Sequence, residues 1–569
     1  MSKEYSVFCI SKNYNLVLQI IWKVYMFKFA KGKLQTRLRW LLLNLGLLIT
    51  PVMISAPVEA AEKIYISYGP IEFSLPIAAL EVYATVGKVE PSLAFYAGYV
   101  KPEEFKQLRQ VLITPIDVTP VAIAQFLYSP QGEIILQRVG EVIQTKARQP
   151  GFYAIRAALI KAAFKPEGLT ILNVLQEFPT YGIRINSQRG FEIIDDLSKL
   201  IKQTQTAIAA VEQASDQEAA AQTERALSEK SLDLRQPGSV SYGKQTITFD
   251  DHYRRREFPV DLYLPESPRE GLAPVIVISH GLGSVRKTFE YLARHLASHG
   301  FAVAVPEHPG SNADQIQALL TGLAKEAAPP SEFINRPVDI KLLLDELESS
   351  FKGQLNLQQV GVLGQSFGGY TSLALAGAEI NFEQLQKDCA PLNEDTLNIS
   401  LLLQCRAFDL PPQDYQLSDQ RIKGAIAINP IASTVLGKSQ LSQIQVPVMV
   451  VAGSDDTIAP ALPEQIQPFT WLTTLQKYLV LLKRGTHFST LAPSEDDVPL
   501  PEAVLGPDPT IAQEYMKALS LAFFQTYIAG KSEYQAYLSA AYAQSLSQEL
   551  MPLSLLTILE PLVREKAGL

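Results

Sequence analysis

The segment Gly364–Gly368, with the sequence GQSFG, places a serine between two glycines in the pattern G-x-S-x-G. It follows the apolar run Val360–Leu363 and precedes a helical pattern over Tyr370–Ala378. A serine on a sharp turn between a strand and a helix projects its hydroxyl above the sheet, and flanking glycines let the two backbones approach. The pattern predicts that Ser366 is a nucleophile. The alternative is a glycine-rich helix entry without reactivity.

A serine hydroxyl needs a general base that removes its proton near neutral pH. His487 follows the last apolar strand, where a loop can bring an imidazole over the serine. His280 and His308 also follow strands, but they precede Ser366, and this type of site runs in the order Ser, Asp, His. We therefore predict His487 as the base. The other three histidines lie in a hairpin or on or just after a helix: His252, His295 and His299.

A carboxylate must orient the imidazole and stabilise its cation. The segment Gly453–Asp456, with the sequence GSDD, follows the penultimate strand and supplies two adjacent aspartates. The usual G-x-x-D spacing favours Asp456 as the acid. Asp455 remains the alternative, and we interpret it as a turn residue whose carboxylate binds backbone amides.

Acyl transfer also creates an oxyanion that needs preorganised hydrogen-bond donors. One donor is expected to be the backbone N–H of Phe367, directly after the nucleophile. The second is expected from the segment Ser279–Gly283, with Leu282 N–H as the candidate. The alternative function for Gly281 and Gly283 in this segment is a phosphate-binding loop, but the lysine spacing of a Walker motif is absent.

Strands alternating with helices from residue 238 onward predict a largely parallel sheet that positions these residues. Ser239–Phe249 and Val260–Leu264 have the pattern of an opening antiparallel pair. The candidate reactive residues all follow strand ends, where open sheets of this kind carry their sites. Six continuous apolar runs are expected to be buried strands: Val275–Ile278, Ala302–Val305, Val360–Leu363, Ala425–Ile428, Val448–Val451 and Leu479–Leu482.

Four segments together resemble the platelet-activating-factor acetylhydrolases and, more broadly, the dienelactone hydrolases: Ser279–Gly283, Leu296–Phe301, Glu307–His308 and Gly364–Gly369. The resemblance covers about residues 240–490. It implies an α/β-hydrolase fold, with helices on both faces of the sheet, and a serine esterase activity. It also places the oxyanion amides at the positions of Leu282 and Phe367.

The sequence departs from these families at two positions. The secreted acetylhydrolases carry an aspartate where this chain has Asn429, so the acid is expected at Asp456 and selectivity for acetyl phospholipids does not follow. The dienelactone hydrolases use a cysteine nucleophile, so Ser366 argues against lactone opening as the main activity.

The domain organisation is predicted from shifts in pattern. Residues 61–200 form a mainly helical domain that resembles an uncharacterised domain ahead of such hydrolases in bacterial proteins, and residues 201–237 form a helical linker. The helical domain is interpreted as a lid, a lipid-facing surface, a folding aid or a stabilising scaffold. Residues 238–569 form the catalytic domain, with a cap insertion over 379–421 and C-terminal helices over 509–569.

Residues 1–60 have the features of an export signal: basic residues, an apolar run over Trp40–Ile54 and small residues before a cleavage site after Ala60. Met26 gives a more ordinary start than Met1. An uncleaved membrane anchor is the alternative. The sequence thus predicts a periplasmic or extracellular protein.

Cys389 and Cys405 are the two cysteines outside this leader, and an even pair in an exported protein predicts one disulfide within the cap insertion. Two unrelated buried thiols are the alternative. The nearby run Leu401–Leu403 could line an acyl pocket.

The net charge of −8 gives no electrostatic footprint for nucleic acid, and no cysteine or histidine cluster has metal-ligand spacing. We therefore expect no cofactor, no metal and no nucleic-acid partner, but a small hydrophobic or lipid ester as substrate, with possible membrane-surface contact. The predicted function is ester hydrolysis through an acyl-serine. The rivals are an amidase or peptidase with the same triad and an inactive lipid-binding protein.

Overall fold

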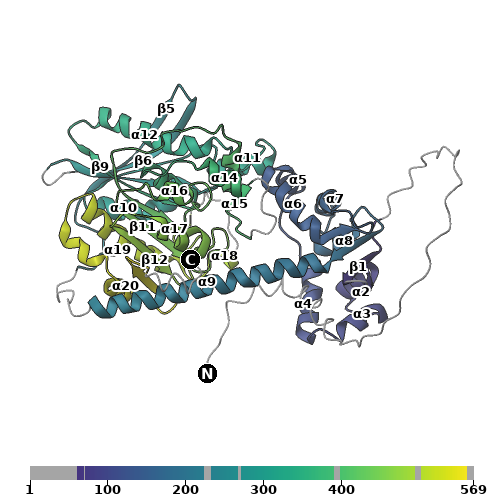
Figure 1. Ribbon diagram of the computed structural model, residues 1–569. Helices are drawn as coiled ribbons and strands as arrows, with labels where there is room; N and C mark the ends of the chain where they lie inside the picture. Colours follow the sequence, from purple (N-terminus) through teal and green to yellow (C-terminus); the bar gives the residue numbers. More distant parts are fainter. Residues whose placement is uncertain are drawn as a thin grey trace. The chain divides into compact units, whose positions relative to one another are not determined.

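The computed structural model describes residues 60–68, 71–222, 232–266, 271–389, 397–493 and 502–559. They form two compact units, and the chain passes from the first to the second between Glu192 and Ile193 (Figure 1). The predicted leader lies outside the described residues apart from Ala60. None of the helices in the described ranges is both long and apolar enough to cross a membrane.

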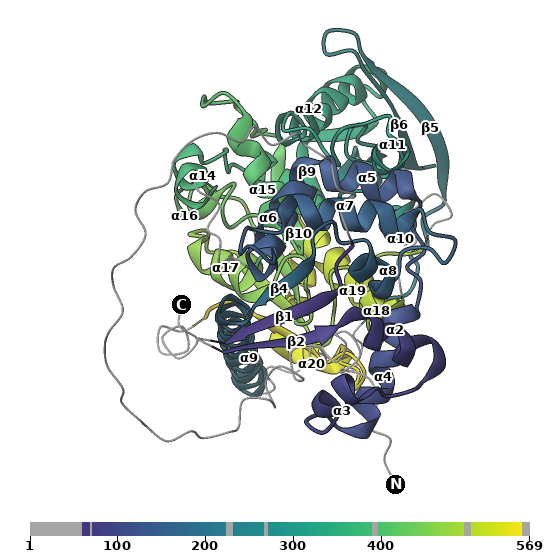
Figure 2. The same ribbon diagram turned by 90° about the vertical axis from the view of Figure 1, so that its right-hand side faces the viewer.

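The first unit, predicted to be mainly helical, also contains a four-stranded sheet (Figure 2). β1 (Lys63–Tyr68) pairs antiparallel with β2 (Ile71–Pro76) and parallel with β4 (Gly182–Asn186), which pairs antiparallel with β3 (Ile143–Thr145). β3 and β4 have three and five residues, too few to give a clear alternation.

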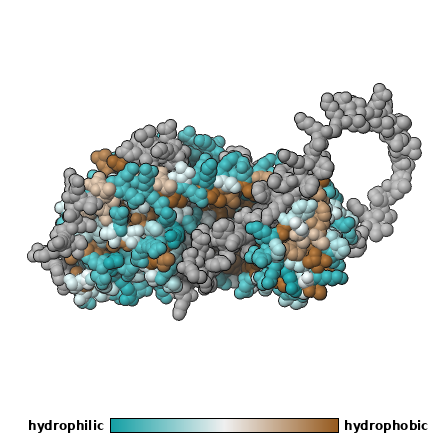
Figure 3. Space-filling view, turned by 90° about the horizontal axis from the view of Figure 1, so that it is seen from below, coloured by the Kyte–Doolittle hydropathy of each residue, from teal (hydrophilic) through white to brown (hydrophobic). Residues whose placement is uncertain are grey.

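The rest of the first unit is mainly helical and leaves large apolar side chains in solvent. Figure 3 shows hydrophobic patches on this unit among hydrophilic side chains. Val86, Phe95, Tyr153 and Phe164 are each more than half exposed. The helices are α2 (Ile77–Val86), α3 (Pro91–Ala97), α4 (Pro102–Ile113), α5 (Pro120–Tyr128), α6 (Pro130–Val142), α7 (Phe152–Ala163) and α8 (Ile171–Gln176).

The long helix α9 (Ser187–Gln222) begins in the first unit and continues along the second. Ala207, Val211 and Ala219 are buried, and the Ser215 hydroxyl accepts a hydrogen bond from the Leu555 N–H at 3.1 Å. These residues recur every four positions and so share one face of the helix. Residues 201–222, expected in a helical linker, belong to a helix that packs within the second unit, which this helix enters at Ile193.

The second unit contains a nine-stranded sheet in the order β13-β12-β11-β10-β9-β7-β8-β6-β5. The six strands from β8 to β12 in this order are parallel, and β5, β6 and β13 are antiparallel additions. The predicted α/β-hydrolase fold is confirmed. The strands are β5 (Tyr242–Asp251), β6 (Arg256–Pro265), β7 (Ala273–Ser279), β8 (Ala302–Pro306), β9 (Leu355–Gln365), β10 (Ile422–Ile428), β11 (Val448–Gly453), β12 (Lys477–Leu482) and β13 (Leu553–Leu556).

Helices cover both faces of this sheet, and each strand supplies side chains to both cores. In β7, Val275 and Val277 belong to one buried cluster, and Ile276 and Ile278 belong to the other. Full burial of such a side chain contributes about 1.5–3 kcal/mol. The helices are α10 (Glu290–Ser298), α11 (Ala313–Thr321), α12 (Glu332–Ser350), α13 (Phe367–Leu375), α14 (Phe382–Cys389), α15 (Leu401–Gln404), α16 (Gly437–Leu441), α17 (Gln467–Trp471), α18 (Glu502–Leu505), α19 (Pro509–Tyr527) and α20 (Ala540–Leu546).

The C-terminal segment differs from the expectation of helices throughout 509–569. α19 and α20 are present, but β13 follows them and pairs antiparallel with β12, from Leu479 opposite Leu556 to Leu482 opposite Leu553. Its four-residue sequence LSLL is buried throughout, so it shows no alternation that would distinguish a strand from a helix.

Candidate active site

Ser366 lies on the turn between β9 and α13 with φ of 56° and ψ of −114°. A positive φ costs a residue other than glycine about 1–3 kcal/mol of backbone strain, and such strained residues cluster at functional sites. A Cβ atom on Gly364 would lie 2.1 Å from the Gly368 carbonyl oxygen, and one on Gly368 would lie 2.0 Å from the Ser279 carbonyl oxygen. Both glycines are therefore needed for the close packing of this turn.

The structure pairs His487 with Asp456. The distance from His487 Nδ1 to Asp456 Oδ2 is 2.7 Å, and the two residues are 4% and 5% exposed. The other carboxylate oxygen of Asp456 accepts hydrogen bonds from the N–H groups of Ile458 and Ala459, each at 2.8 Å. With a proton on Nδ1 directed to this carboxylate, Nε2 of His487 can accept a proton.

Asp455 does not have the role that its position suggested. Its side chain is exposed and accepts a hydrogen bond from the Ser454 hydroxyl at 2.7 Å. The backbone amides that Asp455 was expected to bind are bound instead by Asp456, whose Oδ1 accepts from the N–H groups of Ile458 and Ala459.

Two polar side chains that the sequence analysis did not assign to the site connect its loops. Asn429, at the end of β10, accepts from the Gly453 N–H at 3.0 Å and donates to the Thr486 carbonyl oxygen at 3.1 Å. Gln365 donates from Nε2 to the His487 carbonyl oxygen at 3.0 Å. The segments that carry Asp456, His487 and Ser366 are thus joined by hydrogen bonds. The signal available in the sequence was a polar residue at a strand end.

The two candidate oxyanion amides lie on turns that pack against each other. Phe367 is the first residue of α13, where a backbone N–H has no acceptor within the helix. Leu282 lies in the turn after β7, where a Cβ atom on Gly281 would be 2.4 Å from the Gln365 side-chain oxygen. Gly283, with φ of 70°, completes this turn and donates to the Ser311 carbonyl oxygen at 2.9 Å.

His280 and His308 are buried structural groups. Burial lowers the pKa of His280 to about 4 and the pKa of His308 well below its ordinary value, so both rings are neutral near pH 7. The backbone N–H of His308 donates to His280 Nε2 at 3.0 Å, and the ring Nε2 of His308 lies 2.9 Å from the Ser279 hydroxyl oxygen. Among the described residues no group of three or more histidine, cysteine or acidic side chains has a metal-binding arrangement.

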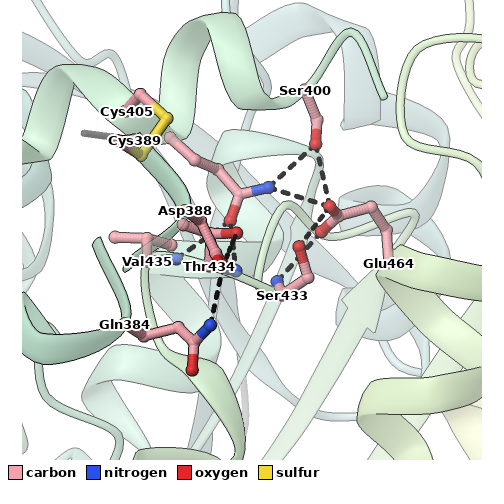
Figure 4. Close-up of a disulfide and its surroundings, with 10 residues drawn as sticks. Gln384, Asp388, Cys389, Ser400, Cys405, Ser433, Thr434, Val435 and Glu464 are labelled. Atoms are coloured by element: carbon pink, nitrogen blue, oxygen red, sulfur yellow. Dashed lines mark hydrogen bonds between the residues drawn. A yellow bond between two sulfur atoms is a disulfide. The ribbon is translucent and has the colours of Figure 1, made fainter. Parts of the chain in front are cut away.

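The predicted disulfide joins Cys389 and Cys405 (Figure 4). The residue before each cysteine forms hydrogen bonds with the loop that follows β10. The Asp388 carboxylate accepts from the Thr434 hydroxyl at 2.9 Å. Gln404 accepts from the N–H groups of Thr434 and Val435 at 2.9 and 3.0 Å. The insertion and the strand-end loop therefore form one connected structure.

The carboxylate of Glu464 is fully buried and forms a second link in this region (Figure 4). It accepts hydrogen bonds from Ser400 and Gln404 of the insertion, at 3.0 and 2.9 Å. It also accepts from the N–H groups of Ala432 and Ser433, at 2.9 and 3.0 Å. Donors from several segments thus stabilise a charge that would otherwise be costly to bury.

We expect the disulfide to be formed in the purified mature protein and to stabilise it. It closes a separation of 16 residues, which corresponds to about 3 kcal/mol of unfolding free energy in the chain-entropy description. Thiol titration under denaturing conditions should find no free cysteine until a reductant is added. Denaturant unfolding should give the same lowered stability for the reduced protein and for a Cys389→Ser, Cys405→Ser double variant. Free thiols in the untreated protein would contradict the prediction.

The cavities do not place the leucine run of the insertion beside Ser366. Leu401 lines a cavity of about 530 Å³ together with Leu397 and Trp471, and neither Ser366 nor His487 is among the lining residues. A larger cavity of about 770 Å³ lies near the start of β7, at the opposite end of the strand from the turn that contains Leu282. The acyl pocket predicted from the leucine run therefore gains no support from these cavities.

Comparison with known families gives two matches. A model described as an alpha/beta hydrolase of unknown function matches residues 60–186, within the first unit. A model described as platelet-activating factor acetylhydrolase, isoform II, matches residues 244–333, which include the Leu282 turn and end before Ser366.

Curated proteins give consistent results. The platelet-activating factor acetylhydrolase of Cavia porcellus is 24% identical over 280 residues, which cover 40% of this chain and 63% of the relative. That of Canis lupus familiaris is 30% identical over 146 residues, which cover 19% of this chain and 33% of the relative. The chain thus spans less than two thirds of the length of each relative. The predicted resemblance to the platelet-activating-factor acetylhydrolases is confirmed.

Proposed function

We propose that this chain, an α/β hydrolase that resembles the platelet-activating factor acetylhydrolases, hydrolyses carboxylic esters through an acyl-serine intermediate. The observation that carries the proposal is the 2.7 Å contact between His487 Nδ1 and Asp456 Oδ2, on loops tied to the strained turn of Ser366. The partial matches to acetylhydrolases support an ester as the substrate.

In the proposed reaction, Ser366 Oγ attacks the ester carbonyl carbon while His487 Nε2 takes the hydroxyl proton. Asp456 stabilises the resulting imidazolium. The carbonyl oxygen becomes an oxyanion that accepts hydrogen bonds from the N–H groups of Leu282 and Phe367. Collapse of this intermediate breaks the bond to the alcohol, which leaves with the proton from His487. Water then attacks the acyl-serine by the same steps, releasing the acid and restoring the hydroxyl.

The substrate class is proposed to be a small hydrophobic or lipid ester. The test is turnover of p-nitrophenyl esters with acyl chains from two to twelve carbons by purified protein, beside the matching p-nitroanilides. We expect measurable ester turnover, a clear preference within the chain-length series and much slower amide turnover. Faster cleavage of the anilides would favour an amidase, and no turnover of either series would contradict the proposal.

The protein is further proposed to act outside the cytoplasm, in the periplasm or the extracellular space. The leader pattern in residues 1–60 and the disulfide in the structure support this placement. N-terminal sequencing of protein from the native host should begin at Ala61. A cytoplasmic protein with its leader intact would contradict export.

A further inference from the structure

Arg336, near the start of α12, is a fully buried cation outside the triad. Its Nη2 donates to the His280 carbonyl oxygen at 2.6 Å, and its Cζ lies 4.6 Å from the ring centroid of Phe367. His280 precedes Leu282 by two residues, and Phe367 is itself an oxyanion candidate. One guanidinium therefore contacts the backbone of the segment that carries Leu282 and the ring of Phe367, the residues of the two candidate oxyanion amides.

The charge of Arg336 is incompletely matched by hydrogen bonds. Its Nε and Nη1 atoms are buried without a hydrogen-bond partner in the described part of the chain. The nearby carboxylates of Glu332 and Asp339 instead bind Arg256, at 2.7 and 2.8 Å. Burial lowers the pKa of Arg336 to about 9, so the group remains cationic near neutral pH.

The helix that carries this arginine is fixed to the catalytic turn. Pro337 has no N–H, so the Phe333 carbonyl oxygen lacks its usual helical donor, and the Tyr370 hydroxyl donates to it at 2.8 Å. The rings of Phe333 and Phe367 pack with centroids 4.7 Å apart. These contacts hold α12 against the first turn of α13 and fix the position of the guanidinium.

We infer that Arg336 is a positioning residue of the oxyanion hole, which aligns the segments of Leu282 and Phe367 and places a positive charge near the developing oxyanion. This inference rests on the proposed ester hydrolysis. A buried cation with unused donors is costly in an apolar environment. Near a site where negative charge develops in the transition state, the same charge favours the reaction because it is already oriented.

The kinetic test compares Arg336→Met and Arg336→Lys with Arg254→Met. Arg254 also binds Asp339 of α12, at 2.7 Å, and is the matched control for loss of a guanidinium from this cluster. For p-nitrophenyl acetate, Arg336→Met should lower kcat by about 100- to 1,000-fold, the range for loss of an oxyanion donor, with KM little changed. Arg336→Lys should retain more activity, and Arg254→Met should stay near the wild-type rate.

A transition-state analogue separates positioning from general destabilisation. A trifluoromethyl ketone forms an oxyanion on the serine, so Arg336→Met should weaken its inhibition by the same factor as it lowers kcat/KM. Unchanged inhibition, or equal kinetic losses in Arg336→Met and Arg254→Met, would overturn the inference.

Amide hydrogen exchange supplies a readout that does not depend on activity. In Arg336→Met, or in Arg336→Lys if the methionine variant does not fold, exchange should increase in peptides covering residues 280–285 and 366–370 and remain unchanged in β11 and β12. Unchanged exchange in the first two peptides would reject the positioning role even if the wild-type protein hydrolysed no ester. Absence of wild-type turnover would instead reject the proposed function.

Discussion

Replacing Ser366 with alanine is expected to reduce kcat on p-nitrophenyl acetate by about 10⁵- to 10⁶-fold, because the acyl-enzyme can no longer form. The residual rate would come from the oxyanion hole and substrate binding alone. The strained backbone should be retained, because alanine has nearly the same size and the turn is held by Gly364 and Gly368. The measurement is steady-state hydrolysis with circular dichroism and thermal unfolding as checks of the fold.

A nearby serine supplies the control for this substitution. Ser372 lies in α13, the helix that follows Ser366; it is fully buried and donates from its hydroxyl to the Gly368 carbonyl oxygen at 3.0 Å. Ser372→Ala should therefore cost some stability and leave the catalytic groups in place. Wild-type activity in Ser366→Ala would contradict the acyl-serine mechanism.

Replacing Asp456 with asparagine should lower kcat by about 10⁴-fold, because the amide favours the wrong tautomer of His487 and cannot stabilise its cation. The same change at Asp455 is the control, since its exposed carboxylate accepts from the Ser454 hydroxyl while His487 Nδ1 contacts Asp456. Both changes remove one negative charge and are nearly isosteric. Comparable losses in the two variants, measured with the same ester, would contradict the assignment of the acid.

The alternation of strands and helices in the second unit could be predicted from sequence because its central strands form continuous apolar runs, buried on both faces. Val275–Ile278 and Val448–Val451, for example, lie in β7 and β11. The short β3, β4 and β13 were missed, since three to five residues carry little periodicity. The packing of α9 depends on a partner surface far along the chain, which a local pattern cannot reveal.

The candidate site, too, could be predicted from the sequence only in part. The sequence order and the strand ends indicated Ser366, Asp456 and His487, because parallel strands bring their carboxyl ends to one edge. Asn429 was noted only as a departure from the family, although its amide joins two loops of the site. The role inferred for Arg336 depends on side-chain contacts between segments more than 25 residues apart in sequence, and no local motif encodes them.

The most direct test of the catalytic account is covalent labelling by a fluorophosphonate followed by peptide mass spectrometry. The account predicts one adduct per molecule, on Ser366, with labelling strongly slowed in His487→Ala because the hydroxyl loses its base. Hydrolysis of esters without an adduct on the Ser366 peptide, or an adduct on a different serine, would contradict it.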